Sequence, residues 1–278
     1  MGAQIGVEYA LGGHDVTLTA RDEARVHERV AAVFETLDRH RLAEPEELTA
    51  ARGRLAVTAA PDPAGWDLVV ESLPESLDLK ADVLRPIAEA SRGATVATNT
   101  SSLSVGELGD RIGAPERTLG THYLNPPLLM PLVEVVAGER TRPDVVERMA
   151  ETLRELGKTP VVCRDVPGFI WNRLQMAVLR EAAWLCENGV ATPATVDDAL
   201  THGLARRWRN VGFFTAVGLG GVATWERVAA NVLPQLSAAT ELSGLERWTP
   251  ADRSLLAEAA ERRDRGLAHD LREERGTD

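Results

Sequence analysis

Short β-branched runs alternate with amphipathic helical patterns through the first 164 residues, and this alternation constrains the fold more than any other feature of the chain. The runs that predict strands are residues 16–19, 55–59, 67–73, 95–98, 118–123, 132–136 and 160–163. Apolar residues recur at helical spacing over residues 22–42 and 75–91. Such an order predicts βαβ units, and therefore an α/β fold built on a parallel sheet.

The secondary-structure pattern changes after residue 164: no further strand is predicted, and only helical patterns follow. The helical patterns that follow are broken at Gly189, Pro193, Gly203, the glycine cluster 218–221 and Pro250. A length of 278 residues suits two domains. We therefore predict an α/β domain over residues 1–165 and an all-α domain over residues 166–278. Residues 261–278 carry dense charge of both signs, so we expect a solvated helix there.

The charge balance excludes one class of partner. Lys and Arg total 31 against 42 Asp and Glu, which gives a formal net charge of −11. General binding to nucleic acid needs clustered cations that meet phosphates, so we expect no nucleic-acid partner. The balance leaves room for a local basic pocket that binds a phosphorylated ligand.

Two further patterns bear on location and metal content. Cys163 and Cys186 lack the spacing of a zinc site or a disulfide framework, so we expect no metal site. No apolar run is long enough to predict a membrane span, and the N-terminal residues show no signal-peptide pattern. A cytoplasmic protein without a membrane partner is the prediction.

Five stretches of sequence carry a family resemblance. They are MGAQI (1–5) with GHDVTL (13–18), DLVVESLPE (67–75) with Lys80, NTSSL (99–103), THYLNPP (121–127) with LVEVV (132–136), and VPGFIWNR (166–173). In this order and spacing they resemble the 3-hydroxyacyl-CoA dehydrogenase family, over residues 1 to about 210. The resemblance implies a Rossmann-like dinucleotide-binding domain, an all-α dimerisation domain that makes a homodimer, and a hinge at Pro167 and Gly168.

The same resemblance implies a function. Members of this family are oxidoreductases of fatty-acid metabolism that transfer a hydride between NAD or NADP and a 3-hydroxyacyl-CoA. For this chain we expect that substrate or a related 3-hydroxy acid. The rival hypothesis is a non-catalytic member of the same fold, like some crystallins, that has lost cofactor binding.

The N-terminus departs from the family pattern. Residues 5–11 suit a helix or, by alternation, a strand; the resemblance favours a helix. Gly2 stands where the last glycine of the cofactor-binding turn belongs, whereas the family's first strand and first two glycines have no counterpart. Either the start codon lies further upstream, which we favour because the candidate catalytic residues persist, or cofactor binding has been lost.

His122 is the candidate general base, because imidazole titrates near neutral pH. Glu134 lies within an apolar run, where a carboxylate is costly to bury without a partner. On an edge strand Glu134 would simply face water. The resemblance instead pairs Glu134 with His122 as the residue that orients the imidazole and stabilises its charged form.

Other site residues also come from the resemblance. It implies that Ser101 hydrogen-bonds the reacting oxygen of the substrate, that Asn99 lies beside the nicotinamide, and that Asn172 helps to bind the substrate. Small hydroxyls after a strand can also cap the next helix, and an Asn in a first helical turn is often only a cap. Glu75 and Lys80 match cofactor contacts, with a solvated helix face as the alternative for Lys80.

Two further stretches bear on specificity: one on the choice between NAD and NADP, and the other on the substrate. Members that use NAD carry an acidic residue at the end of the second strand, where this chain has Ala20 followed by Arg21, so NADP becomes a candidate. Asp22 is expected to cap the next helix. Residues 203–214 resemble the branch that acts on gulonate or carnitine, which puts CoA specificity in doubt.

Overall fold

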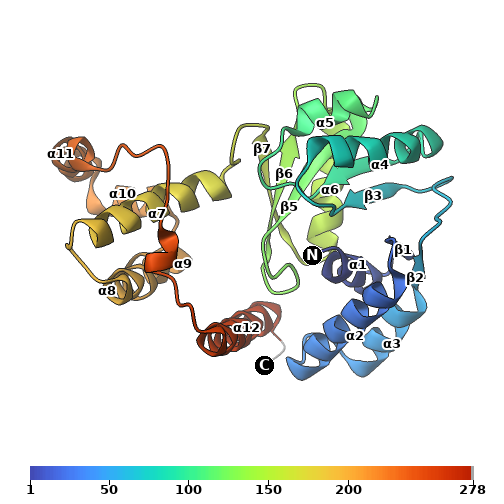
Figure 1. The fold of residues 1–278 in the computed structure, drawn as a ribbon, viewed down its shortest axis with the longest axis horizontal. Helices are drawn as coiled ribbons and strands as arrows, with labels where there is room; N and C mark the ends of the chain where they lie inside the picture. Colours follow the sequence, from blue (N-terminus) through green and yellow to red (C-terminus); the bar gives the residue numbers. More distant parts are fainter. Residues whose placement is uncertain (277–278) are drawn as a thin grey trace. The chain divides into compact units, whose positions relative to one another are not determined.

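The first part of the chain forms a five-stranded sheet in the order β3-β4-β5-β6-β7, seen in a computed structural model that describes residues 1–276 (Figure 1). The strands are β3 (Leu68–Glu71), β4 (Thr95–Thr98), β5 (Thr118–Tyr123), β6 (Leu132–Ala137) and β7 (Thr159–Arg164). All neighbours pair in parallel except β5 and β6. Residues 124–131 are too few for a crossover, so these two strands pair antiparallel and the sheet is mixed.

Two further strands stand apart from this sheet. β1 (Val16–Thr19) and β2 (Leu55–Thr58) pair in parallel with each other and form a separate two-stranded sheet. The N-terminal residues form helix α1 (Gly2–Leu11), as predicted. This helix packs tightly on β1, because a Cβ atom on Gly6 would lie 2.5 Å from Cδ2 of Leu18.

The five-stranded sheet is the middle layer of three. Its side chains alternate between faces, so that Val96 packs with α4 (Leu77–Ala90) and α5 (Val105–Arg111), whereas Ala97 packs with α1 and α6 (Pro143–Glu155). The same alternation sends Val133 and Val135 of β6 to the α1 and α6 face, and leaves Glu134 on the opposite face.

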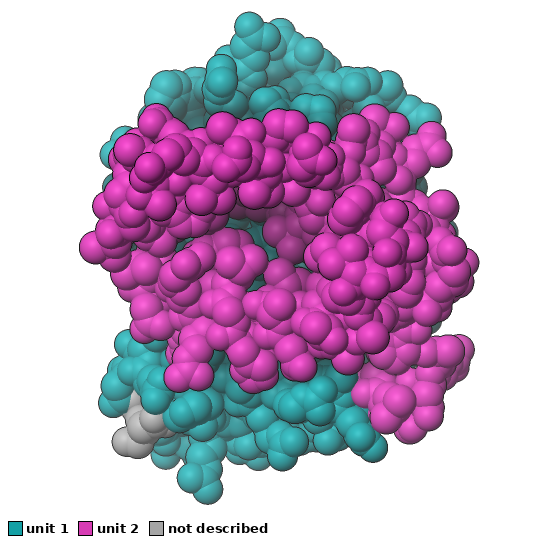
Figure 2. All heavy atoms as spheres, turned by 90° about the vertical axis from the view of Figure 1, so that its left-hand side faces the viewer, with its two compact units in different colours: residues 1–172, 258–278 teal, residues 173–257 magenta. Residues whose placement is uncertain are grey.

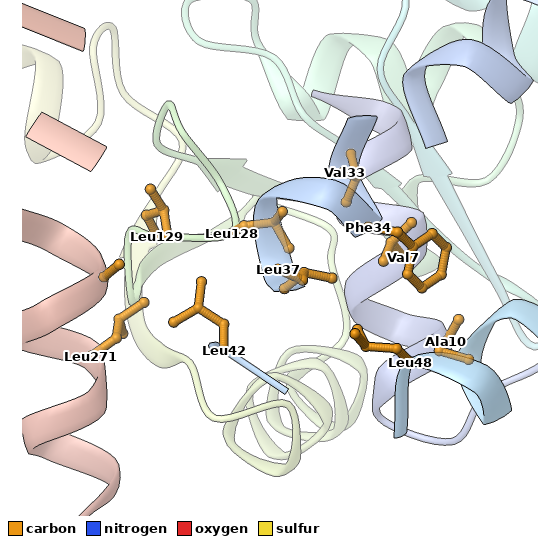
Figure 3. Close-up of a cluster of buried hydrophobic side chains, with 12 residues drawn as sticks. Val7, Ala10, Val33, Phe34, Leu37, Leu42, Leu48, Leu128, Leu129 and Leu271 are labelled. Atoms are coloured by element: carbon orange, nitrogen blue, oxygen red, sulfur yellow. The ribbon is translucent and has the colours of Figure 1, made fainter. Parts of the chain in front are cut away.

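A second hydrophobic cluster joins both ends of the chain (Figure 3). It combines side chains of α1, α2 (Glu23–Arg39) and α3 (Pro45–Gly53) with Leu128, Leu129 and Leu271. Leu271 lies near the end of α12 (Arg253–Arg275) and is 5% exposed. The expectation that residues 261–278 are fully solvated was therefore wrong for this face of the helix; residues 277–278 lie outside the described part.

A buried ion pair also ties α1 to the sheet. Nζ of Lys158 lies 2.5 Å from Oε1 of Glu8 and donates to the carbonyl oxygens of Pro127 and Met130. Burial raises the pKa of Glu8 to about 7, although the charge and hydrogen bond of Lys158 act against that rise.

The remaining helices build a second compact unit, Arg173–Ala257, which Figure 2 colours separately. Its α-helices are α7 (Trp171–Glu187, which begins in the first unit), α8 (Pro193–Asp198), α9 (Arg206–Asn210), α10 (Phe213–Gly220) and α11 (Val222–Val232). The sequence predicted that a helix ends at Gly203. This is wrong, because a π-helical segment, Ala199–Ala205, continues through Gly203. The first unit comprises Met1–Asn172 and the segment from Glu258 onward, whereas the sequence prediction divided the chain once, at 165/166.

Two features are absent from the described residues, a membrane-spanning helix and a cluster of metal ligands. None of the helices within residues 1–276 is both long and apolar enough to cross a membrane. The same residues contain no group of three or more His, Cys, Asp or Glu side chains placed to hold a metal ion.

Candidate active site

His122 and Glu134 face each other across the antiparallel pair β5–β6. The register places the two residues directly opposite, and Nδ1 of His122 lies 2.6 Å from Oε2 of Glu134. Both residues are buried, at 6% and 1% exposure. β6 lies between β5 and β7, so the alternative in which Glu134 faces water from an edge strand is wrong.

The second oxygen of Glu134 is held by backbone. The N–H groups of Ile170 and Trp171 each donate to Oε1 at 2.8 Å. Burial alone would raise the pKa of Glu134, but the hydrogen bond from His122 and those from the two amides together hold this pKa below its ordinary value. An ionised Glu134 only accepts hydrogen bonds, so the proton between the two residues belongs to Nδ1 of His122.

Asn99, Ser101 and Asn172 are linked to this pair through residues adjacent to it in the chain. Oδ1 of Asn99 accepts from the N–H of Tyr123, which links the ends of β4 and β5 beside His122. Nδ2 of Asn172 donates to the carbonyl oxygen of Ser101 at 2.9 Å. Because Asn172 follows Trp171, the structure brings Ser101, Asn172, Glu134 and His122 into one neighbourhood.

Glu75 organises the loop that carries Ser101. Its Oε1 accepts from Oγ1 of Thr100 and from the N–H groups of Ser101 and Ser102 at 2.6 to 3.1 Å. Burial would raise the pKa of Glu75, but these hydrogen bonds, with the charge of Lys80, hold it below its usual value. The carboxylate therefore fixes the loop backbone, a role that the sequence did not indicate.

Lys80 is fully buried, so the alternative of a solvated helix face is wrong. Its ammonium donates to both oxygens of Glu71, at 2.8 and 2.9 Å, and to the carbonyl oxygen of Leu73 at 3.1 Å. Oε2 of Glu71 also accepts from Oγ1 of Thr98. In this structure Lys80 closes a buried network between β3, β4 and α4; its predicted contact with the cofactor stays a prediction.

The residues predicted to hold a cofactor lie where strands end and a helix begins. Gly2 opens α1 against the end of β3, because a Cβ on Gly2 would lie 3.4 Å from Cβ of Ser72. Ala20 and the exposed Arg21 follow β1, and Asp22 caps α2 by accepting from the N–H of Arg25, as predicted. The positive end of α1 suits the phosphates of a dinucleotide.

Several of these groups were missed from sequence. Glu71 stands at the end of an apolar run, and this position could have predicted that its carboxylate is buried against a cation such as Lys80. The two backbone amides that bind Glu134 left no sign, because any residue except proline supplies an N–H group.

Comparison with known proteins identifies the family of the chain. Residues 1–166 match the family model described as 3-hydroxyacyl-CoA dehydrogenase, NAD binding domain, and residues 168–252 match the model of its C-terminal domain. L-carnitine dehydrogenase of Streptomyces griseus subsp. griseus is 37% identical over 94% of this chain and 83% of that protein.

Other relatives are matched over shorter lengths. The 5-formyl-3-hydroxy-2-methylpyridine 4-carboxylate 5-dehydrogenase of Mesorhizobium japonicum is 37% identical over 63% of this chain, and the match spans only 57% of that relative's length. The chain thus spans less than two thirds of the length of this relative.

Solved structures agree on the fold. The crystal structure of a 5-formyl-3-hydroxy-2-methylpyridine 4-carboxylic acid 5-dehydrogenase, described as an NAD+ dependent dismutase, has a TM-score of 0.86 at 30% identity, covering 100% of this chain and 96% of that chain. The 3-hydroxybutyryl-CoA dehydrogenase of Escherichia coli K12 has a TM-score of 0.68 at 34% identity, covering 72% and 43%. The chain therefore belongs to the 3-hydroxyacyl-CoA dehydrogenase family.

Proposed function

We propose that this protein is a dehydrogenase that oxidises the secondary alcohol of a 3-hydroxy acid, or of its acyl-CoA ester, with a nicotinamide cofactor. The observation that carries the proposal is the buried pair of His122 and Glu134, whose Nδ1 and Oε2 lie 2.6 Å apart near the end of β5. A carboxylate that orients a buried imidazole has a direct use in base catalysis, and this favours an enzyme over a non-catalytic member of the fold.

His122 acts as the general base in this proposal. Its Nδ1 proton is committed to Glu134, so Nε2 of the neutral ring holds the lone pair that accepts the hydroxyl proton of the substrate. Glu134 fixes the plane of the imidazole and stabilises the charge that the ring gains. In the reverse direction the protonated ring returns that proton to the carbonyl oxygen.

Ser101 and Asn172 hold the substrate. The backbone of Ser101 is fixed at its N–H by Glu75 and at its C=O by Asn172, so the position of its hydroxyl is set before the substrate arrives. A preorganised donor of this kind orients the reacting oxygen toward His122 and stabilises charge that develops on that oxygen.

The cofactor would lie along the strand ends, with the N-terminus of α1 at Gly2 facing its phosphates and Asn99 beside its nicotinamide. When bound, the nicotinamide supplies the hydride acceptor. We place NAD first, because the first family model is described as an NAD binding domain. NADP rests on Ala20 and Arg21, which replace an acidic side chain with a cation.

The substrate class follows from chemistry and from the relatives. A secondary hydroxyl is the group that this base and this donor can serve, and its position at C3 of a carboxylic acid or thioester is taken from the relatives. L-carnitine is such a 3-hydroxy acid, and the named carnitine dehydrogenases include one that matches 94% of this chain. A small 3-hydroxy acid therefore comes ahead of a CoA ester in our proposal.

The test is turnover of a panel of 3-hydroxy acids and 3-hydroxyacyl-CoA esters with NAD and with NADP, for the wild type and for His122→Ala. We expect the variant to lose at least about a hundredfold in kcat, the lower range of a general-base contribution. His27→Ala, a change at an exposed histidine of α2, is the control and keeps wild-type turnover. Near-normal activity of His122→Ala would refute the mechanism.

A further inference from the structure

Phe169 has a backbone conformation that a bulky residue rarely adopts. Its φ is 48°, in the left-handed region, and it directly follows Gly168 at φ 80°. Phe169 is also 2% exposed, so the conformation is held inside the protein. Left-handed geometry costs a non-glycine residue conformational energy, and such residues gather at functional sites.

The conformation has a direct geometric result. Phe169 donates its N–H to the carbonyl oxygen of Val166 at 3.0 Å, which closes a tight turn. The next two amides, of Ile170 and Trp171, then point the same way and both meet Oε1 of Glu134. Successive N–H groups after such a turn form a concavity that binds an anionic oxygen.

The ring of Phe169 contacts the other half of the pair. It packs edge-on against the imidazole of His122, with ring centroids 5.7 Å apart. It also belongs to a small apolar cluster with Val105 and Val136, against which Cys163 packs. The ring therefore holds the imidazole from one side while the amides that follow it hold Glu134.

We propose that Phe169 is a positioning residue for the catalytic pair: its left-handed turn aims two backbone amides at Glu134, and its ring fixes His122 in the plane that Glu134 requires. The inference rests on the proposed function, in which His122 is the base. It assigns Phe169 no contact with the substrate or the cofactor.

The titratable neighbours of Glu134 are few. His122 faces it from β5, and Cys163 lies near it on β7, where burial and then the charge of Glu134 raise the pKa of the thiol to about 11. Loss of the two amide bonds would therefore leave His122 as the main group that keeps Glu134 ionised, and the pKa of Glu134 would rise.

The experiment compares Phe169→Leu with Phe34→Leu. Both phenylalanines are buried, at 2% and 1% exposure, and Phe34 lies in the cluster around α2. The two variants thus lose the same atoms from buried sites, and only one of these sites adjoins the catalytic pair. For each variant we would measure kcat/KM against pH with the best substrate of the panel, and the low-field proton resonance of the His122–Glu134 hydrogen bond.

For Phe169→Leu we expect kcat/KM to fall between about tenfold and a hundredfold, the loss that slight misplacement of reacting groups produces. The acid limb of the pH profile moves to lower pH, because a misplaced Glu134 stabilises the charged imidazole less, and the low-field resonance moves upfield or disappears. Phe34→Leu keeps the wild-type profile and the wild-type resonance.

A Phe169→Leu protein with the profile and resonance of Phe34→Leu would overturn the inference and leave the proposed function standing. A wild-type protein that turns over none of the panel contradicts the proposed function instead. In that case the resonance, which needs no turnover, still decides whether Phe169 positions the pair.

Discussion

Glu134 shows how one carboxylate stays ionised inside an apolar strand. Four valine and leucine side chains flank it in residues 132–136, yet each of its oxygens has hydrogen-bond donors: His122 at one, and two backbone amides at the other. A buried charge is tolerated only with such partners, and removal of one partner costs more than the pair contributes. The position of this single oxygen pair decides which nitrogen of His122 is free to act.

We propose that Ala20 also acts at the scale of one residue, in the choice between NAD and NADP. A carboxylate there would accept hydrogen bonds from the ribose hydroxyls of NAD and repel the 2′-phosphate of NADP. We expect Ala20→Asp to shift the ratio of kcat/KM values toward NAD by at least about tenfold, since juxtaposed like charges cost several kcal/mol. Steady-state kinetics with both cofactors measures the ratio.

The charge-matched control is Thr17→Asp, on the exposed side of the same strand and two residues before its end. It adds the same charge and should leave the ratio unchanged. An unchanged ratio in Ala20→Asp would remove Ala20 and Arg21 from the choice of cofactor.

At the scale of elements, α12 belongs to two parts of the molecule. It begins at Arg253, and its last turns carry Ala268 and Leu271 into the cluster of Figure 3, beside Leu42 and Leu129. The cluster is therefore complete only when the C-terminal part of α12 packs against the rest of the first unit.

A prediction about stability follows from that contact. Leu271→Ala leaves a cavity among buried side chains, so we expect the free energy of unfolding to fall by about 2–5 kcal/mol. Leu255→Ala on the same helix is the control, because Leu255 is 54% exposed and its loss should change stability by less than about 0.5 kcal/mol. Urea unfolding of both variants measures the difference; equal losses would contradict the role given to Leu271.

The sequence predicted all seven strands of the described residues but not every helix. Thr95–Thr98 and Thr118–Tyr123 match their predicted bounds, because both are rich in β-branched and aromatic residues, which favour strands. Helices α3, α5 and α6 were not predicted, although Pro143 with Val145 and Met149 gave a readable start for α6. Whether two strands pair in parallel or antiparallel could not be predicted from the sequence pattern. Alternation of apolar residues indicates which face of the sheet each residue occupies, but not which strand lies beside it.

The site was predictable in identity and not in geometry. His122 and Glu134 were found from motifs, whereas the left-handed turn at Phe169 depends on packing around the pair that no local pattern describes. The burial of Lys80 was missed for a related reason: its partner Glu71 lies nine positions away in the chain and reaches it only when β3 lies beside α4.

For the whole molecule we propose a homodimer built on the second unit, as the family resemblance implies. This unit exposes large apolar side chains, among them Phe214 at 87% and Leu219 at 76%. Exposed apolar groups of this size mark association surfaces. We expect Phe214→Asp to give a monomer at concentrations where the wild type is a dimer, measured by sedimentation.

Val162→Asp is the control for that experiment. Val162 is 53% exposed on β7 of the first unit, so a charge there should leave the dimer intact. A wild type that sediments as a monomer at micromolar concentration, or a dimer that survives Phe214→Asp, would contradict the proposal.

The far edge of the five-stranded sheet has a practical consequence for handling the protein. Among the described residues β7 pairs only with β6, so its other side presents backbone N–H and C=O groups. Open edges are templates for strand addition, by an extended peptide or by another molecule of the same chain. Association that grows past a dimer with concentration, and that a lysine in β7 suppresses, would be the signature of this edge and would set the limit on concentrating the protein.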